Sequence, residues 1–172
     1  MSYQVEISRL NDVALINLRG TEEAVSRFES VLELALPRRA NAVCAKEGIA
    51  VLSLAPDHWW VRTSSQNEEQ TFNTLSEAIT TEHAAVTIVT DHFAGFSIVG
   101  TEALLVLRQG LSLDLRNLRS GQCTRGSFAR CGGTLHVIDE RQHYDLFVES
   151  SYADYTRAWL TAATGDDCVY GR

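Results

Sequence analysis

The sequence predicts an α+β protein in which a β-α-β-β-α order of elements occurs twice and helices pack on antiparallel sheet. Runs rich in Val, Leu and Ile, typical of strands, alternate with segments whose apolar residues recur every three or four positions, typical of helices. The string Gly-Thr-Glu stands between a strand and a helix at 20–22 and again at 100–102. The 172 residues are 45% hydrophobic and 22% charged, the composition of a globular chain about one domain long.

The first copy occupies the first half of the chain. Its predicted elements are a strand at 12–18, a helix between 21 and 37, a strand at 48–54, a turn at 55–57 and a strand at 58–63. Thr21 is placed to cap that helix and Pro37 to end it. Ser65 and Glu68 have the spacing of a capping box, which predicts a second helix. The inward face of this second helix carries Phe72, Leu75 and Ile79.

The second copy begins with a linking strand. Its predicted elements are strands at 85–90 and 93–99, a helix through about 108, an irregular stretch at 111–130, strands at 131–139 and 144–149, and a helix from 151. Gly110 ends the first of these helices. Two such units indicate a pseudo-twofold fold of ferredoxin-like kind. Because no stretch rich in Pro, Gly or Ser separates the halves, we expect a single domain over 1–172, with a loose tail at 165–172.

The charge of the chain narrows the classes of protein to which it can belong. Its net charge is −7, from 22 acidic and 15 basic residues, which argues against a nucleic-acid or anionic-membrane binder. Fourteen of the basic residues are arginines, and arginine is enriched at protein interfaces. No apolar run is long enough to span a membrane and the N-terminus lacks the pattern of a signal peptide, so we expect a cytoplasmic protein. Its four cysteines are then expected to be reduced thiols.

Motifs for cofactors and catalysis are absent or incomplete. The sequence contains no dinucleotide-binding G-x-G-x-x-G, no P-loop and no G-x-S-x-G nucleophile elbow. Four residues have the chemistry of zinc ligands without the spacing: Cys123, Cys131, His136 and His143. Asp-His strings at 57–58 and 91–92 fit turn chemistry better than a general base. We therefore assign no catalytic, cofactor-binding or metal site to this chain.

Aromatic and basic side chains offer candidates for a partner interface. Neighbouring residues of a strand face opposite sides, so we expect one of Trp59 and Trp60 in the core and the other exposed or covered by a partner. An irregular stretch as long as 111–130 is unusual in a compact domain and is either a solvated loop or a docking arm for an acidic or cofactor-bearing partner. The candidate interface residues are Trp59, Trp60, Arg116, Arg119, Arg125 and Arg130.

Several short strings follow one another in a characteristic order between about Gly48 and Ala163. They are Leu54-Ala55-Pro56-Asp57-His58-Trp59-Trp60, Ile98-Val99-Gly100, Ser112-Leu113-Asp114-Leu115, Gly121-x-Cys123, Leu135-His136, Ser151-Tyr152-Ala153-Asp154-Tyr155 and Trp159-Leu160. Their order and spacing resemble those of the gamma subunit of heterotetrameric sarcosine oxidase. His58 stands where that family usually has Glu, and Ser112 where it usually has Pro.

The resemblance implies an α+β fold similar to the folate-binding domain of the glycine-cleavage aminomethyltransferase. It implies a small, non-catalytic and structural subunit of a flavin-dependent complex that oxidatively demethylates sarcosine to glycine, giving hydrogen peroxide and either formaldehyde or methylene-tetrahydrofolate. The implied partners are alpha, beta and delta subunits, and the cofactors FAD, FMN, NAD, tetrahydrofolate and zinc belong to them. The fold likeness alone leaves an alternative, a stand-alone folate-binding or aminomethyltransferase-like domain.

Overall fold

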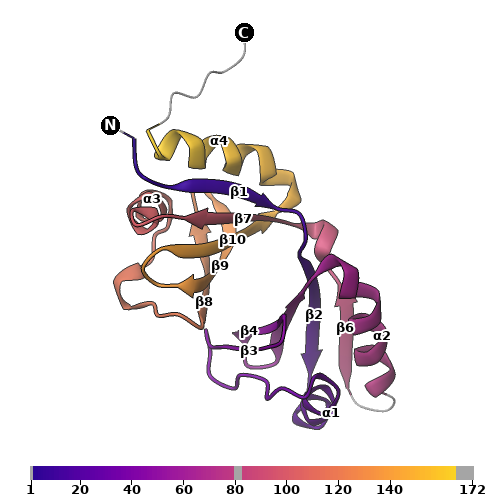
Figure 1. Ribbon diagram of the computed structural model, residues 1–172. Helices are drawn as coiled ribbons and strands as arrows, with labels where there is room; N and C mark the ends of the chain where they lie inside the picture. Colours follow the sequence, from indigo (N-terminus) through magenta and orange to yellow (C-terminus); the bar gives the residue numbers. More distant parts are fainter. Residues whose placement is uncertain (1, 80–82, 166–172) are drawn as a thin grey trace. The chain divides into compact units, whose positions relative to one another are not determined.

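The computed structural model describes residues 2–79 and 83–165, and these form two compact units (Figure 1). Unit 1 contains residues 2–10, 91–120 and 124–165, and unit 2 contains residues 11–79, 83–90 and 121–123. A single domain over 1–172 stays a prediction. Nearly all of the tail expected to be loose lies outside the described residues.

Unit 2 is a five-stranded antiparallel sheet with two helices. Its elements are β2 (Ala14–Gly20), α1 (Glu22–Leu32), β3 (Val43–Lys46), β4 (Ile49–Ala55), β5 (His58–Thr63), α2 (Glu68–Ala78) and β6 (Ala84–Ile88). The strands are ordered β3-β4-β5-β2-β6. A short 3-10 turn, Ser65–Asn67, leads from β5 into α2.

Unit 1 likewise consists of a five-stranded sheet and two helices. Its elements are β1 (Glu6–Leu10), β7 (Phe93–Val99), α3 (Ala103–Gly110), β8 (Gln122–Phe128), β9 (Cys131–Asp139), β10 (His143–Glu149) and α4 (Ala153–Ala163), with 3-10 turns at Thr90–His92, Leu115–Asn117 and Ser150–Tyr152. Its strands are ordered β1-β7-β10-β9-β8. The first two residues of β8 belong to unit 2, where Ala42 and Gln122 form an isolated bridge.

The two sheets have the same topology once β7, β8, β9 and β10 are matched to β2, β3, β4 and β5. Four strands of each sheet then follow the order of a ferredoxin-like unit, and β3 or β8 adds an edge. At the opposite edge of each sheet, the outermost strand comes from the other half of the sequence. Strand β1 precedes β2 in the chain but pairs with β7, with Ile7 opposite Ile98, whereas β6 precedes β7 but pairs with β2, with Val86 opposite Leu18. The predicted duplicated α+β fold is therefore confirmed, and strands β1, β3 and β8 are additions to the predicted elements.

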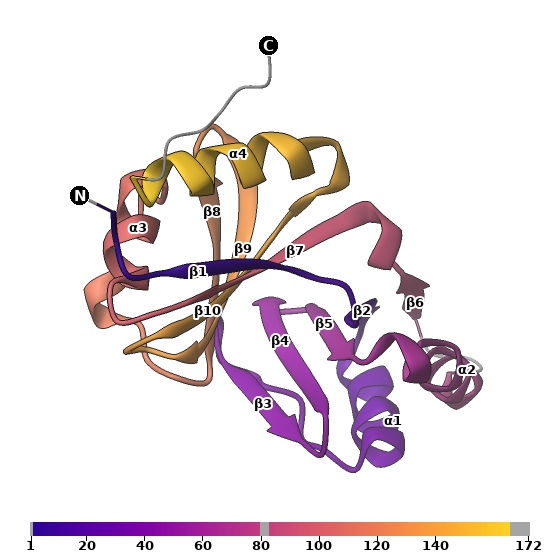
Figure 2. The ribbon, with the colours of Figure 1, turned by 45° about the horizontal axis from the view of Figure 1, so that its top comes forward.

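Each sheet buries the face on which its two helices lie (Figure 2). In unit 1 the buried cluster includes Phe96, Leu135 and Leu146 of the sheet, Val106 and Leu107 of α3, and Leu160 of α4. In unit 2 it includes Ile16, Val51 and Val61 of the sheet, Val25 and Phe28 of α1, and Leu75 of α2. Phe72 and Ile79 are partly buried against this second cluster, so the apolar face predicted for α2 is confirmed.

Helix caps differ from the prediction. Thr21 occupies the N-cap position of α1 but its side chain makes no capping hydrogen bond. The backbone N–H of Ser65 donates to the carboxylate of Asp12 at 3.1 Å, and its hydroxyl donates there too, so Ser65 does not form the expected capping box. Helix α1 ends at Leu32, because Glu33 has φ 48°, before the chain reaches Pro37.

Candidate functional site

Both tryptophans of β5 are buried, so the expected core ring is confirmed and the exposed alternative for the second ring is wrong. They face opposite sides of the strand, as predicted, and each is 2% exposed. Trp59 packs in the helix-facing cluster of unit 2, and its indole N–H donates to the carbonyl of Pro37 at 2.9 Å. Neither ring therefore presents surface in this chain.

The stretch expected to be irregular, 111–130, is a loop only as far as 121, because Gln122–Phe128 forms strand β8. The loop folds on an ion pair. Arg116 donates from Nε to one oxygen of Asp114 at 2.8 Å and from its guanidinium to the other at 3.0 Å, and its backbone N–H donates to Asp114 as well. These bonds hold the pKa of Asp114 near 2, below its ordinary value of 3.8. Leu111 and Leu115 are buried and anchor the loop.

The four candidate arginines are all exposed, but they differ in what they contact. Arg116 is engaged by Asp114, and Arg119 donates to the carbonyls of Arg116 and Leu118 at 2.9 and 3.0 Å. Arg125 on β8 and Arg130 in the following turn form no ion pair with another described residue. The first two arginines stabilise the loop, and the last two are available to a partner.

A row of polar side chains crosses the helix-free face of the unit 1 sheet. Ser97, Asp145 and His136 stand opposite one another on β7, β10 and β9, and His143 is two residues before Asp145. Nε2 of His143 lies 3.1 Å from the Ser97 hydroxyl and 3.3 Å from an oxygen of Asp145. A hydrolytic triad needs the carboxylate on one ring nitrogen and the serine on the other. Both contacts fall on the same nitrogen, so this row is not a catalytic relay.

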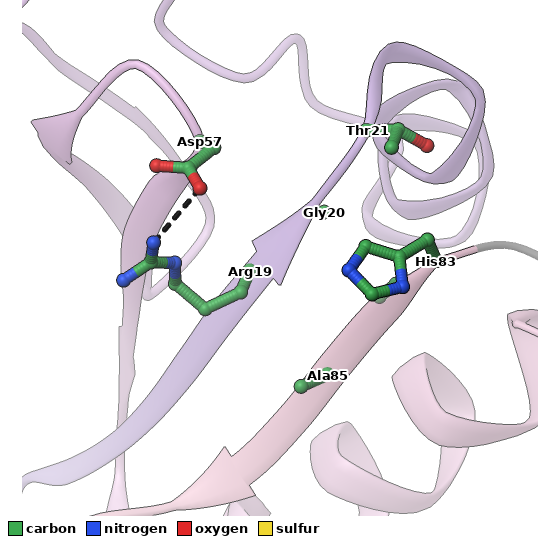
Figure 3. Close-up of a pocket in the computed structure, with 7 residues that line it drawn as sticks. Arg19, Gly20, Thr21, Asp57, His83 and Ala85 are labelled. Atoms are coloured by element: carbon green, nitrogen blue, oxygen red, sulfur yellow. Dashed lines mark hydrogen bonds and ion pairs between the residues drawn. The ribbon is translucent and has the colours of Figure 1, made fainter.

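A cavity of about 300 Å³ opens where β2 leads into α1 (Figure 3). Arg19 and Asp57 form an ion pair of 2.8 Å at one side of it, and His83 lies at the other. The guanidinium of Arg19 lowers the pKa of Asp57, which makes this carboxylate a poor proton acceptor. His58, its neighbour in the Asp-His string, instead contacts the side chain of Asn17. Asp57 and His58 are therefore not assembled as a general base.

The cysteines and other metal-binding side chains are separated. Cys44, Cys123 and Cys131 are free thiols. Burial raises the pKa of Cys123 to about 12, and its thiol donates to the carbonyl of Ser53 at 3.5 Å. Within 2–79 and 83–165, no three His, Cys, Asp or Glu side chains gather as metal ligands, so this donor set does not fit zinc. No helix among the described residues is long and apolar enough to cross a membrane.

These features define a small protein of two ferredoxin-like sheets with exposed arginines on one of them. A sequence model of the sarcosine oxidase gamma subunit family matches residues 22–166. The chain therefore belongs to the sarcosine oxidase gamma subunit family. Comparison with curated protein sequences gives no match.

Solved structures support the fold. A chain of heterotetrameric sarcosine oxidase from Corynebacterium sp. U-96, in complex with pyrrole 2-carboxylate, has a TM-score of 0.87 at 22% identity, over 94% of this chain and 84% of that one. Glycine cleavage system aminomethyltransferase T from Bartonella henselae has a TM-score of 0.72 at 14% identity, over 93% of this chain and 46% of that one. This chain thus spans less than half of the aminomethyltransferase. The predicted likeness to that enzyme is confirmed, and the alternative of a stand-alone aminomethyltransferase-like domain is not favoured.

Two further features of the described structure were not predicted from the sequence. One is the turn at Ala129 and Arg130, which have φ 45° and 75° although neither is glycine. The other is a second cavity, in unit 2, whose lining runs from Val31 to Thr74. No local motif marks the turn or the cavity. Gly48, at the matching turn of the first copy, indicates only that the turn at 129–130 needs a positive φ.

Proposed function

We propose that this chain is a non-catalytic assembly subunit of a flavin-dependent sarcosine oxidase heterotetramer and docks on the larger subunits. The observation that carries the proposal is the family match over 22–166. The side chains give it support. The Ser97–His143–Asp145 contacts lack the geometry of a relay, and the thiol of Cys123 is held in its unreactive protonated form.

The reaction assigned to the complex converts sarcosine, dioxygen and water to glycine, formaldehyde and hydrogen peroxide. When tetrahydrofolate is present, the one-carbon unit leaves as methylene-tetrahydrofolate instead. Two electrons pass from the N-methyl group to dioxygen, and flavin supplies this chemistry. We assign FAD, FMN, NAD and tetrahydrofolate to alpha and beta subunits and zinc to a delta subunit. In this proposal the role of the present chain is to bind and position those subunits, and the complex acts in the cytoplasm.

The docking surface proposed for the partner includes Arg125 and Arg130. Both guanidinium groups are exposed, and a guanidinium forms bidentate hydrogen bonds with a carboxylate. The partner surface is therefore expected to present Asp or Glu. Arg116 and Arg119 lie in the loop that precedes the same strand, but their hydrogen bonds within that loop mean that replacing them changes the loop as well as the interface.

Co-expression of the full chain with alpha, beta and delta subunits tests the proposal. We expect one complex on size exclusion, and loss of assembled oxidase when the chain is omitted. Arg125→Glu with Arg130→Glu should weaken assembly at least about tenfold, because like charges then meet. Arg141→Glu, at another exposed arginine of unit 1, serves as the matched control. A chain that elutes alone, beside a fully active partner complex, would refute the proposal.

Calorimetry with tetrahydrofolate distinguishes the assembly function from the alternative, a stand-alone folate-binding domain. A stand-alone folate-binding domain would bind tetrahydrofolate at micromolar concentration in the absence of any partner. The assembly subunit is expected to give no saturable heat. Micromolar binding by the isolated chain would replace the assembly function with the folate-binding one.

A further inference from the structure

Strand β6 leaves one side of its backbone unpaired. It is the outermost strand of the unit 2 sheet, beside β2 (Figure 1). The N–H of Val89 and the carbonyl of His83 bond to the backbone of β2 and of the residue that follows it, so odd-numbered residues of this segment turn their backbone groups toward β2. The N–H and C=O groups of Ala84, Val86 and Ile88 therefore point away from the sheet, and none of them bonds to another described residue.

The other sheet edges carry charged side chains and β6 does not. Natural edge strands usually contain a charge, a proline or a bulge, which discourages pairing with another chain. The remaining edge strands of the two sheets follow this rule, with Glu6 and Arg9 on β1, Lys46 on β3 and Arg125 on β8. Strand β6 reads Ala-Ala-Val-Thr-Ile, and the side chain of Ile88 is 41% exposed. Of the edges in the described sheets, β6 is therefore the best suited to accept a further strand.

Helix α2 places a carboxylate beside this free edge. The helix packs on β6 and β2, and the carboxylate of Glu68 accepts a hydrogen bond from the hydroxyl of Thr90, two residues beyond β6. The first turn of α2 therefore lies over the end of β6. Gln70 and Thr74 line the cavity next to α1, so the helical repeat turns Glu69 to the opposite side, toward the free edge. Glu69 is exposed there.

The charge around the edge selects the partner. Helix α2 carries Glu68, Glu69 and Glu77, and the sequence has no Lys or Arg between Arg62 and Arg108. A segment that contains Lys or Arg is therefore attracted to this edge, and an acidic segment is repelled. A second copy of this chain is disfavoured as the partner, because pairing of two β6 edges would bring two acidic helices together.

We propose that β6 accepts an extended, basic segment of a larger sarcosine oxidase subunit as an additional strand. The backbone of that segment pairs with Ala84, Val86 and Ile88, and a Lys or Arg on its helix-facing side pairs with Glu69. The inference rests on the proposed assembly function, and it adds a contact in unit 2 to the arginine surface proposed for unit 1.

Hydrogen exchange at single-residue resolution tests the pairing. In the isolated full chain, the amides of Ala84, Val86 and Ile88 should exchange almost as fast as in an unstructured peptide, whereas the amides of Ala85 and Thr87, which face β2, are protected. In the complex co-expressed with alpha, beta and delta subunits, exchange of the first three amides should slow at least about tenfold.

The outcomes distinguish this inference from the assembly function. A complex that assembles without added protection of these three amides would overturn the inference and leave the assembly function intact. Failure to form any complex would overturn both. Protection of the same amides in a dimer of the isolated chain would identify a second copy as the occupant and would also overturn the inference.

Proline at position 88 separates the contribution of the backbone from that of the side chain. Ile88→Pro removes one outward N–H and no bond to β2, so it should weaken assembly about tenfold. Ile88→Thr keeps the N–H and a branched side chain, and should change assembly less than about twofold. Protection of the Ala85 and Thr87 amides checks that β6 still forms in each isolated variant. Equal effects of the two substitutions would contradict the pairing.

Glu69→Lys tests the charge without changing the backbone. It should weaken assembly about tenfold, because like charges then meet. Glu47→Lys makes the same change of charge at an exposed residue in the turn between β3 and β4, at the opposite edge of the sheet, and should have little effect. Equal losses in these two variants would show that no basic segment binds beside β6.

Discussion

The phenol of Tyr155, on α4, donates a hydrogen bond of 2.6 Å to the carbonyl of Ala129, in the turn between β8 and β9. The N–H of Ala129 donates in turn to the carbonyl of Gly110 at the end of α3, at 2.9 Å. Ala129 and Arg130 both have positive φ, which costs an L-residue about 1–2 kcal/mol. Two helices of unit 1 therefore hold a strained turn in place, and that turn presents Arg130.

Arg130→Gly should stabilise the chain. In the matching turn of the other copy, Glu47 and Gly48 have φ 48° and 82°, so glycine occupies the position equivalent to Arg130. Relief of the strain should raise the free energy of unfolding by about 1 kcal/mol, measured by urea denaturation. Gly48→Ala should lower the free energy of unfolding by about the same amount. If the Arg130→Gly chain were less stable than the parent, contacts of the Arg130 side chain would contribute more to the free energy of unfolding than the backbone strain costs.

Tyr155→Phe should destabilise the same turn. It removes the hydrogen bond to Ala129, and because that bond is exposed, water replaces it in part. We expect the free energy of unfolding to fall by about 0.5–1 kcal/mol, with Tyr152→Phe as the matched control. Equal effects of the two substitutions would mean that the bond to Ala129 contributes nothing.

The ion pair of the 111–121 loop makes a prediction about pH. The pKa of Asp114 should be about 2 by carbon-detected NMR titration, and Arg116→Ala should return it toward 3.8. Because the folded-state pKa is the lower one, the pair stabilises the loop fully above pH 3.8 and this contribution is lost as the pH falls through about 2. Titration of Asp114 near its ordinary pKa in the parent chain would show that the pair is not formed.

Gly100 controls the docking of the exchanged strand β1. Its φ is 147°, and a Cβ there would stand 2.2 Å from the carbonyl oxygen of Gln4, just before β1. Gly100→Ala should lower the free energy of unfolding by about 1–3 kcal/mol and increase hydrogen exchange at residues 6–10. Gly132→Ala, where a Cβ meets no atom within 4 Å, is the control. Unchanged exchange in β1 would contradict this role of Gly100.

Cys123 should resist alkylation. With a pKa of about 12 instead of 9.0, its thiolate fraction at pH 8 is about a thousandfold smaller than that of an ordinary thiol. Peptide mapping after iodoacetamide treatment should find Cys123 modified only in denaturant. The raised pKa also means that its contribution to stability is complete below pH 9.0 and is lost as the pH rises through about 12. Rapid alkylation of Cys123 in the folded chain would show that the thiol is not buried.

Periodicity predicts the elements that contribute most to the two cores. Strands β2, β4, β5, β7, β9 and β10 and helices α1 to α4 coincide with apolar patterns, because burial of one face determines both pattern and element. Strands β3 and β8 are edges of their sheets. Gln122–Phe128 has few β-branched residues, so pairing with β9 forms it and local propensity does not. The pairing of β1 with β7 and of β6 with β2 joins segments that are distant in the sequence. Periodicity describes single segments and therefore does not predict such pairing.

The candidate site is less accessible to sequence reasoning. The arginines were located correctly on the surface, but Arg116 and Arg119 are bound within their loop, and only geometry separates them from Arg125 and Arg130. The exposed position expected as one alternative for a tryptophan is wrong. The alternation of side chains predicts which face of β5 each ring lies on, but it does not predict what covers that face.

The central claim is that this chain is a stoichiometric structural subunit of a sarcosine oxidase. Native mass spectrometry of the complex purified through a tag on its largest subunit tests it most directly. The account predicts that the intact mass contains one copy of this 19.1 kDa chain, and that its release with Arg125→Glu and Arg130→Glu leaves the redox cofactors on the remaining subunits. An active complex whose mass excludes the chain, or a flavin that departs with it, would contradict the account.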